Sequence, residues 1–268
     1  MSKLAETGSR TSAPDPLAYV TDRLRAATVL KDPYPYYYIE DVFPDGYYES
    51  RLRHLPDSRV YDNLFAVTDL KLDHFRHRDQ RDLNDGWTEL LPEDIKSFWV
   101  DFNRWFMGLD FARAVLGTFG EQLRERFGGE PSWPEVSVEA QFIRHRAGYF
   151  LGPLSDLYTK MVVLIFYLAP DDSFAHLGTS LYRPKDPTFT CPDSKHYPFE
   201  DFVKAKTAPY KRNSVLAFLR SDSSFHGLEP LSEHDVAGGP RDLIQYVLHD
   251  KQVRQDQLRA RRLREAGE

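Results

Sequence analysis

The sequence of 268 residues predicts an α+β fold in which helices come first and strands follow. In the first half, apolar residues recur at helical spacing. In the second half, short runs rich in β-branched and aromatic residues are separated by proline, glycine and aspartate. Because the two kinds of element do not alternate as βαβ units, we expect the helices to buttress an antiparallel sheet or barrel.

The chain begins with alternating helical and extended segments. Apolar spacing predicts helices over residues 16–30 and 44–55, with an extended aromatic segment over 34–42 between them. Residues 60–72 predict a strand or an irregular segment. The very polar stretch 73–85 predicts a loop, because it contains no run of apolar residues.

Two further helices complete the first half. Pro92 is suited to a first helical turn, and the two acidic residues after it favour the positive end of a helix, so we expect a helix from Pro92 to near Trp105. Another helix over residues 110–127 has one apolar face. Two glycines, beginning at Gly128, are expected to end it.

The second half is expected to consist mainly of strands. These strands are predicted over residues 136–143, 158–168, 214–219 and 242–248. The intervening polar stretch 186–208 predicts a loop at the entrance to a site, where substrate selection usually lies.

These elements are expected to form one large domain. The predicted parts are a leader rich in small and polar residues over 1–15, a single domain over 16–250, and a charged helix or tail over 251–268. Within the domain, helical support is expected mainly over 16–130 and the β core over about 134–250. The basic run Arg259–Arg264 predicts a solvated face of a terminal helix, with a contact surface as the alternative.

Charge and composition exclude several classes of partner. A net charge of −6 and a pI near 5.9 give no broad positive field for nucleic acid. The single Cys191 excludes an internal disulfide. The longest apolar stretch, 161–169, is shorter than the roughly 20 residues of a membrane helix. Because the N-terminal residues also lack the apolar run of a signal peptide, we expect a cytoplasmic protein with no membrane contact.

Three segments of the strand-rich half contain groups suited to metal and carboxylate chemistry. The segment Gly-Tyr-Phe-Leu-Gly-Pro-Leu-Ser-Asp ends at Asp156, the segment Ser-Phe-His-Gly-Leu-Glu-Pro contains His226, and Arg241 opens a third segment. A carboxylate and imidazoles together hold Fe(II) in a 2-His-1-carboxylate triad that leaves other coordination positions open. A guanidinium fork matches the shape of a carboxylate.

In order, spacing and flanking residues, these segments resemble the 2-oxoglutarate- and Fe(II)-dependent oxygenases, especially the prolyl-hydroxylase-like branch, over about residues 18–250. The resemblance implies a double-stranded β-helix core, the jelly-roll of cupins, buttressed by the N-terminal helices. It implies metal ligation by Asp156 and His226. It also implies that Arg241 binds the distal carboxylate of the cosubstrate 2-oxoglutarate, and that His145 stands where related enzymes place a tyrosine that contacts the cosubstrate.

Position 154 departs from the family pattern. The resemblance places a first metal-binding histidine two residues before Asp156, where this chain has Leu154. A leucine side chain donates no electron pair to a metal. Two interpretations follow: an enzyme whose iron is held by Asp156 and His226 with cosubstrate and water, and a non-catalytic binding protein that keeps the fold but has lost productive iron binding.

For the enzyme, the resemblance implies a dioxygenase that hydroxylates a C–H bond, and a small molecule is the expected substrate. Halogenation is not implied, because the family's halogenases lose the carboxylate and here the carboxylate is present. Four aromatic residues are further candidates for the wall of the site: Phe142, Tyr149, Tyr158 and Tyr182. His249 is expected to face solvent.

Overall fold

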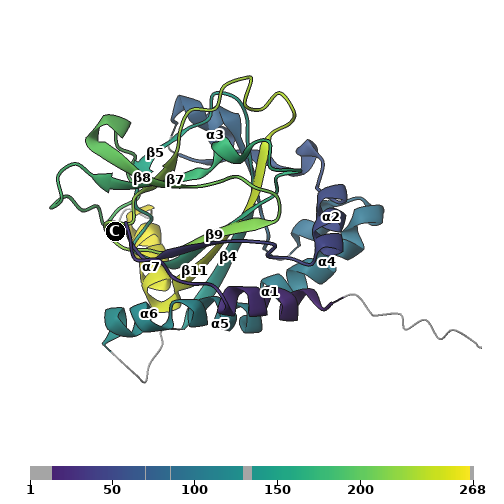
Figure 1. Ribbon diagram of the computed structural model, residues 1–268, viewed down its shortest axis with the longest axis horizontal. Helices are drawn as coiled ribbons and strands as arrows, with labels where there is room; N and C mark the ends of the chain where they lie inside the picture. Colours follow the sequence, from purple (N-terminus) through teal and green to yellow (C-terminus); the bar gives the residue numbers. More distant parts are fainter. Residues whose placement is uncertain (1–13, 70, 85, 129–134, 266–268) are drawn as a thin grey trace, which may run out of the picture.

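A computed structural model of the chain describes residues 14–69, 71–84, 86–128 and 135–265 (Figure 1). Its helices are α1 (Pro16–Arg25), α2 (Asp45–Arg53), α3 (Leu64–Val67), α4 (Glu93–Phe106), α5 (Leu109–Thr118), α6 (Gly120–Phe127) and α7 (Lys251–Glu265). Its strands are β1 (Tyr36–Glu40), β2 (Asp62–Asn63), β3 (Arg78–Asp82), β4 (Val136–His145), β5 (Leu151–Leu154), β6 (Lys160–Tyr167), β7 (Thr179–Pro184), β8 (Phe202–Ala208), β9 (Ser214–Leu219), β10 (His226–Leu228) and β11 (Arg241–Asp250).

The strands from β4 to β11 wind between two antiparallel sheets. The larger sheet has the order β1-β9-β6-β11-β4-β3-β2, and the smaller sheet has the order β5-β10-β7-β8. Successive core strands fall in alternate sheets, except that β7 and β8 are neighbours in the smaller one. This winding is that of a double-stranded β-helix, so the predicted α+β class and jelly-roll core are confirmed.

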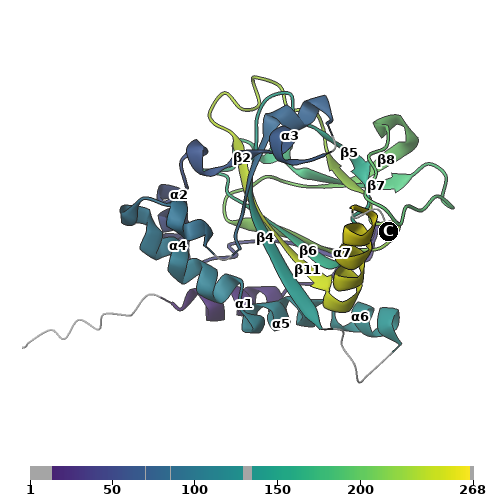
Figure 2. The same cartoon turned by 180° about the vertical axis from the view of Figure 1, so that it is seen from behind.

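The outer face of the larger sheet is covered by helices. Alternate residues of β11, including Ile244 and Tyr246, point to this face and pack with Trp99, Phe102 and Phe106 of α4. Figure 2 shows α1, α4, α5 and α6 gathered beside the long strands β4 and β11. The N-terminal helices therefore bury one side of the sheet and hold the other side toward the barrel.

The inner face of the same sheet is apolar at its centre but not throughout. Leu243 and Val247 of β11 belong to the core inside the barrel. Between them, Gln245 pairs in register with Gln141 of β4. Both glutamines line a cavity inside the barrel, and the side-chain nitrogen of Gln141 also donates to Oδ1 of Asp82 at 2.6 Å.

Several predicted boundaries were wrong. The stretch 73–85, predicted as a loop, contains a 3₁₀ turn (Asp73–His77) and the strand β3. This strand has polar side chains because it lies near the edge of the sheet, with only the two-residue β2 beyond it, and so produces no apolar alternation. The predicted loop 186–208 likewise contains β8 along the edge of the smaller sheet.

The helical predictions also need correction in detail. The segment 110–127 forms two helices, because Phe119 leaves helical geometry with φ −110° and ψ 25°. Residues 60–72 contain β2 and the short helix α3. In the part of the chain that the structure describes, no helix has the length and apolarity to cross a membrane. Of the predicted leader, residues 1–13 lie outside the described residues.

Candidate active site

A cavity of about 450 Å³ lies inside the barrel, with walls from both sheets and from α7. The larger sheet contributes Glu139, Gln141, Gln245 and His249, and the smaller sheet contributes Leu154 and His226. Among the aromatic residues proposed for its wall, Tyr149 does line it, whereas Phe142 packs on the opposite, helix-covered face of the sheet. The cavity contains both predicted metal-binding residues.

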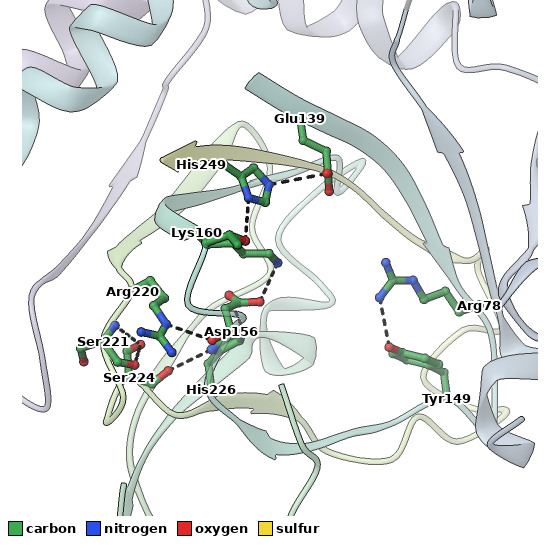
Figure 3. Close-up of polar contacts among 11 residues, drawn as sticks. Arg78, Glu139, Tyr149, Asp156, Lys160, Arg220, Ser221, Ser224, His226 and His249 are labelled. Atoms are coloured by element: carbon green, nitrogen blue, oxygen red, sulfur yellow. Dashed lines mark hydrogen bonds and ion pairs between the residues drawn. The ribbon is translucent and has the colours of Figure 1, made fainter. Parts of the chain in front are cut away.

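Asp156 and His226 are brought together on one side of this cavity (Figure 3). Asp156 follows β5, and His226 begins the neighbouring strand β10. The Nδ1 atom of His226 lies 3.1 Å from the carbonyl oxygen of Ser224, which can only accept, so Nδ1 carries the proton. Nε2 then faces Oδ2 of Asp156 at 3.6 Å. Within the described residues this buried Oδ2 has no hydrogen-bond partner.

The close packing of β5 and β10 depends on a glycine beside His226. A Cβ atom at Gly227 would lie 2.4 Å from the carbonyl oxygen of Leu151, far inside contact distance. Only glycine leaves room for the two strands to approach in this way. Gly227 therefore lets β10 approach β5 closely enough to place His226 beside the turn that contains Asp156.

Lys160 pairs with the second oxygen of the same carboxylate. Its Nζ donates to Oδ1 of Asp156 at 2.6 Å, and both side chains are nearly buried. Burial by itself would raise the pKa of Asp156, but the charge of Lys160, together with His226, outweighs it and holds that pKa below its usual value. Burial lowers the pKa of His226 despite the nearby carboxylate. Near neutral pH the pair is therefore a carboxylate and a neutral imidazole.

Leu154, where the family resemblance implies a third ligand, lies beside this pair. Leu154 is the register partner of His226, so the two side chains lie on the same face of the smaller sheet, and Leu154 also lines the cavity. Across the described ranges, no group of three or more His, Cys, Asp or Glu side chains is placed to hold a metal. Asp156 and His226 therefore fit a metal ion with two protein ligands, but the residues present do not form a 2-His-1-carboxylate triad.

Arg241 and His145 lie together, but outside the lining of this cavity. Arg241 donates from Nε to the carbonyl oxygen of Leu177 at 2.6 Å and from a terminal nitrogen to Oγ1 of Thr179 at 3.2 Å. Its other terminal nitrogen lies 3.1 Å from Nδ1 of His145. Burial, then the charges of Arg241 and Arg78, hold the pKa of His145 well below its ordinary value. Arg241 and His145, predicted to bind the cosubstrate, are thus adjacent. Each guanidinium nitrogen of Arg241 already contacts a protein atom.

A second arginine, which the sequence did not single out, lines the cavity instead. Arg78 of β3 is the register partner of His145, and a terminal nitrogen of its guanidinium lies 3.4 Å from the hydroxyl oxygen of Tyr149. Figure 3 shows the guanidinium of Arg78 and the hydroxyl of Tyr149 directed toward Asp156 from the opposite side. No sequence signal marks Arg78, because it sits in the polar stretch that predicts a loop.

The cavity is bounded at another side by α7. Arg254 of this helix donates to Glu139, and His249 lies 3.5 Å from the same carboxylate. Burial would raise the pKa of Glu139, but His249, Lys160 and Arg254 together lower it to about 2. The expectation that His249 faces solvent was wrong, because the ring is 4% exposed and bonds to Thr159. One face of the terminal helix therefore packs against the barrel, while Arg259 remains exposed.

Arg220 holds the turn that carries Asp156. Its Nε donates to the carbonyl oxygen of Asp156 at 2.9 Å, and a terminal nitrogen donates to that of Pro192 at 2.7 Å. We expect Arg220→Met to lower the free energy of unfolding by about 1–3 kcal/mol, because buried carbonyl groups lose their donors. It should also speed amide exchange over residues 156–160. Urea unfolding and hydrogen exchange measure both effects.

The exposed Arg183 of β7 supplies a matched control for this substitution. Its ion pair with Asp32 has side chains 49% and 70% exposed, so Arg183→Met should change stability by less than about 1 kcal/mol. Equal effects of the two substitutions, or unchanged amide exchange in Arg220→Met, would contradict a role for Arg220 in holding the turn.

No protein-family model and no curated protein matches the chain. Among solved structures, it is similar to a Trichoplax adhaerens prolyl hydroxylase in complex with a hypoxia inducible factor peptide, at 12% identity over 88% of this chain and 90% of that one, with a TM-score of 0.49. It is also similar to a 2OG-Fe(II) oxygenase family oxidoreductase from Burkholderia pseudomallei, at 9% identity over 93% of each chain, with a TM-score of 0.47. A third similar structure is a Pseudomonas putida prolyl-4-hydroxylase, at 15% identity over 88% of this chain and 99% of that one, with a TM-score of 0.46. Since all three TM-scores are below 0.5, the fold assignment rests on the strand order described above.

Proposed function

We propose that this protein is a 2-oxoglutarate- and Fe(II)-dependent oxygenase-type enzyme that hydroxylates a C–H bond of a small molecule. The observation that supports the metal site is the buried pair of Asp156 and His226, in which one carboxylate oxygen lacks a partner and faces Nε2 at 3.6 Å. A buried polar atom without a partner calls for an ion or a water molecule. A carboxylate and a neutral imidazole are suitable ligands for Fe(II).

In this proposal the chain's own groups hold and orient the reactants. Iron, 2-oxoglutarate and dioxygen together would supply the oxidising power that hydroxylation of a C–H bond requires, with dioxygen as the oxidant. Ser224 fixes the ring of His226 and leaves Nε2 available. Arg220 fixes the backbone of Asp156. Gln141 and Gln245 line the cavity and offer hydrogen bonds to a small molecule.

A second candidate function is a binding protein of the same fold without metal-dependent catalysis. One observation favours it specifically: the ammonium group of Lys160 lies 2.6 Å from Asp156 and supplies the positive charge that a metal ion would otherwise supply. Leu154 removes a ligand from the same place. In this candidate the barrel still binds a small polar molecule, and Asp156, Lys160 and His226 form its recognition surface.

Metal titration separates the two candidates. We expect the natural chain to bind Mn(II), or Fe(II) under anaerobic conditions, in the micromolar range when 2-oxoglutarate is present. Binding is measured by calorimetry, and by electron paramagnetic resonance for Mn(II). His226→Ala should abolish it, because a single carboxylate ligand remains. Failure of the natural chain to bind either metal would remove the enzyme candidate and leave the binding protein.

A further inference from the structure

Arg78 differs from the other cations that line the cavity. Lys160 is paired with Asp156, and Arg254 is paired with Glu139. Arg78 forms no ion pair with any carboxylate in the part of the chain that the structure describes. Among the described lysine and arginine residues that line the cavity, Arg78 is therefore the one whose charge is not paired with a carboxylate.

The donors of Arg78 are also largely unused. Its Nε atom is buried and has no hydrogen-bond partner among the described residues. Within the described part of the chain, its guanidinium forms one hydrogen bond, the long 3.4 Å contact with the hydroxyl oxygen of Tyr149. The phenol accepts this bond, so its own proton is free to donate. A guanidinium and a phenol directed into one cavity provide the donors that a carboxylate binds.

Arg241, the guanidinium implied by the family resemblance, is less available. Each of its three nitrogens already bonds to a protein atom. It is 2% exposed, and it does not line the cavity that contains Asp156 and His226. The ring of His145, which contacts Arg241, also stacks on Tyr149 with centroids 4.0 Å apart.

We propose that Arg78, with the hydroxyl of Tyr149, is the carboxylate-binding group of this cavity, and that the bound molecule extends from Arg78 toward Asp156 and His226. The choice of 2-oxoglutarate as the carboxylate rests on the proposed function. The binding site itself does not, because Arg78 and Tyr149 recognise a carboxylate whether or not a metal is bound. Succinate, a dicarboxylate that is one carbon shorter than 2-oxoglutarate and has no oxo group, therefore binds at the same place with the metal absent.

Calorimetric titration of the full chain with 2-oxoglutarate and, separately, with succinate tests this site with and without Mn(II). We expect Arg78→Gln to weaken binding of both molecules about 10- to 100-fold, because charge-assisted hydrogen bonds are lost. Arg78→Lys should lose less affinity, because the positive charge remains although the paired donors of the planar guanidinium are gone. The exposed Arg76, two residues away, is the matched control, and Arg76→Gln should bind like the natural chain.

The outcomes distinguish this inference from the proposed function. Unchanged affinity in Arg78→Gln, with circular dichroism and melting unchanged, overturns the role of Arg78, and loss of affinity in Arg241→Gln would then return that role to Arg241. If the dicarboxylates bind in a way that depends on Arg78 while the chain binds no metal, the inference is supported and the enzyme candidate is excluded. Binding of neither molecule to the natural chain, with or without Mn(II), overturns both.

Discussion

Leu154→His should tighten Fe(II) or Mn(II) binding by about 10- to 100-fold and raise the rate of succinate formation from 2-oxoglutarate. The size of this effect follows from the cost of removing groups that support a metal, where even indirect partners change affinity or activity by about that factor. The geometry is favourable because residue 154 is the register partner of His226 and precedes Asp156 by two residues. A histidine there would direct its ring to the face where the other two ligands already meet.

The measurements are metal affinity by calorimetry and succinate release with iron and oxygen, compared between the natural chain and the variant. Leu154→Ile is the matched control, since it changes the shape of the side chain without adding a ligand. Turnover that appears only in Leu154→His would show that the natural chain is an oxygenase disabled at one position. Equal turnover in both chains would show that two protein ligands suffice, and absence of 2-oxoglutarate binding in both would end the cosubstrate assignment.

The family resemblance was sufficient to predict that Asp156 and His226 lie together, although 70 residues separate them. A glycine and a proline of β5 precede the aspartate, and a glycine follows the histidine in β10. These residues specify two adjacent strands that end at the same place. The residues of such segments remain recognisable in a single sequence, although the need for Gly227 becomes clear only from its close contact with Leu151 in the folded chain.

Arg78, Lys160 and α7 could not be predicted in the same way. Arg78 reaches the cavity only because β3 adds to the sheet beside β4, and its polar sequence gives no strand periodicity. Lys160 is the first residue of an apolar strand, and its approach to Asp156 depends on how the intervening turn closes. The position of α7 depends on contacts such as Arg254 with Glu139, 115 residues apart in the chain.

Lys160→Met should strengthen metal binding while weakening the fold in the absence of metal. The ammonium group lies 2.6 Å from the carboxylate that a metal would bind, so removing it ends a competition for Asp156. It also leaves a buried carboxylate unpaired, which costs about 3 kcal/mol of the free energy of unfolding. The pKa of Asp156 should rise as well, because its nearest cation is gone while burial continues to disfavour the charged form.

Urea unfolding with and without Mn(II), together with calorimetry of metal binding, checks these opposing effects. Metal should restore most of the stability lost in Lys160→Met, since an ion bound to Asp156 replaces the missing charge and stabilises the folded state by mass action. The exposed Lys206 of β8 gives the matched control, and Lys206→Met should alter neither quantity. Unchanged metal affinity in Lys160→Met would mean that the ammonium group does not take the metal's place. The binding-protein candidate would then lose the observation that favours it, because Lys160 would be only the structural partner of a carboxylate that metal can still reach.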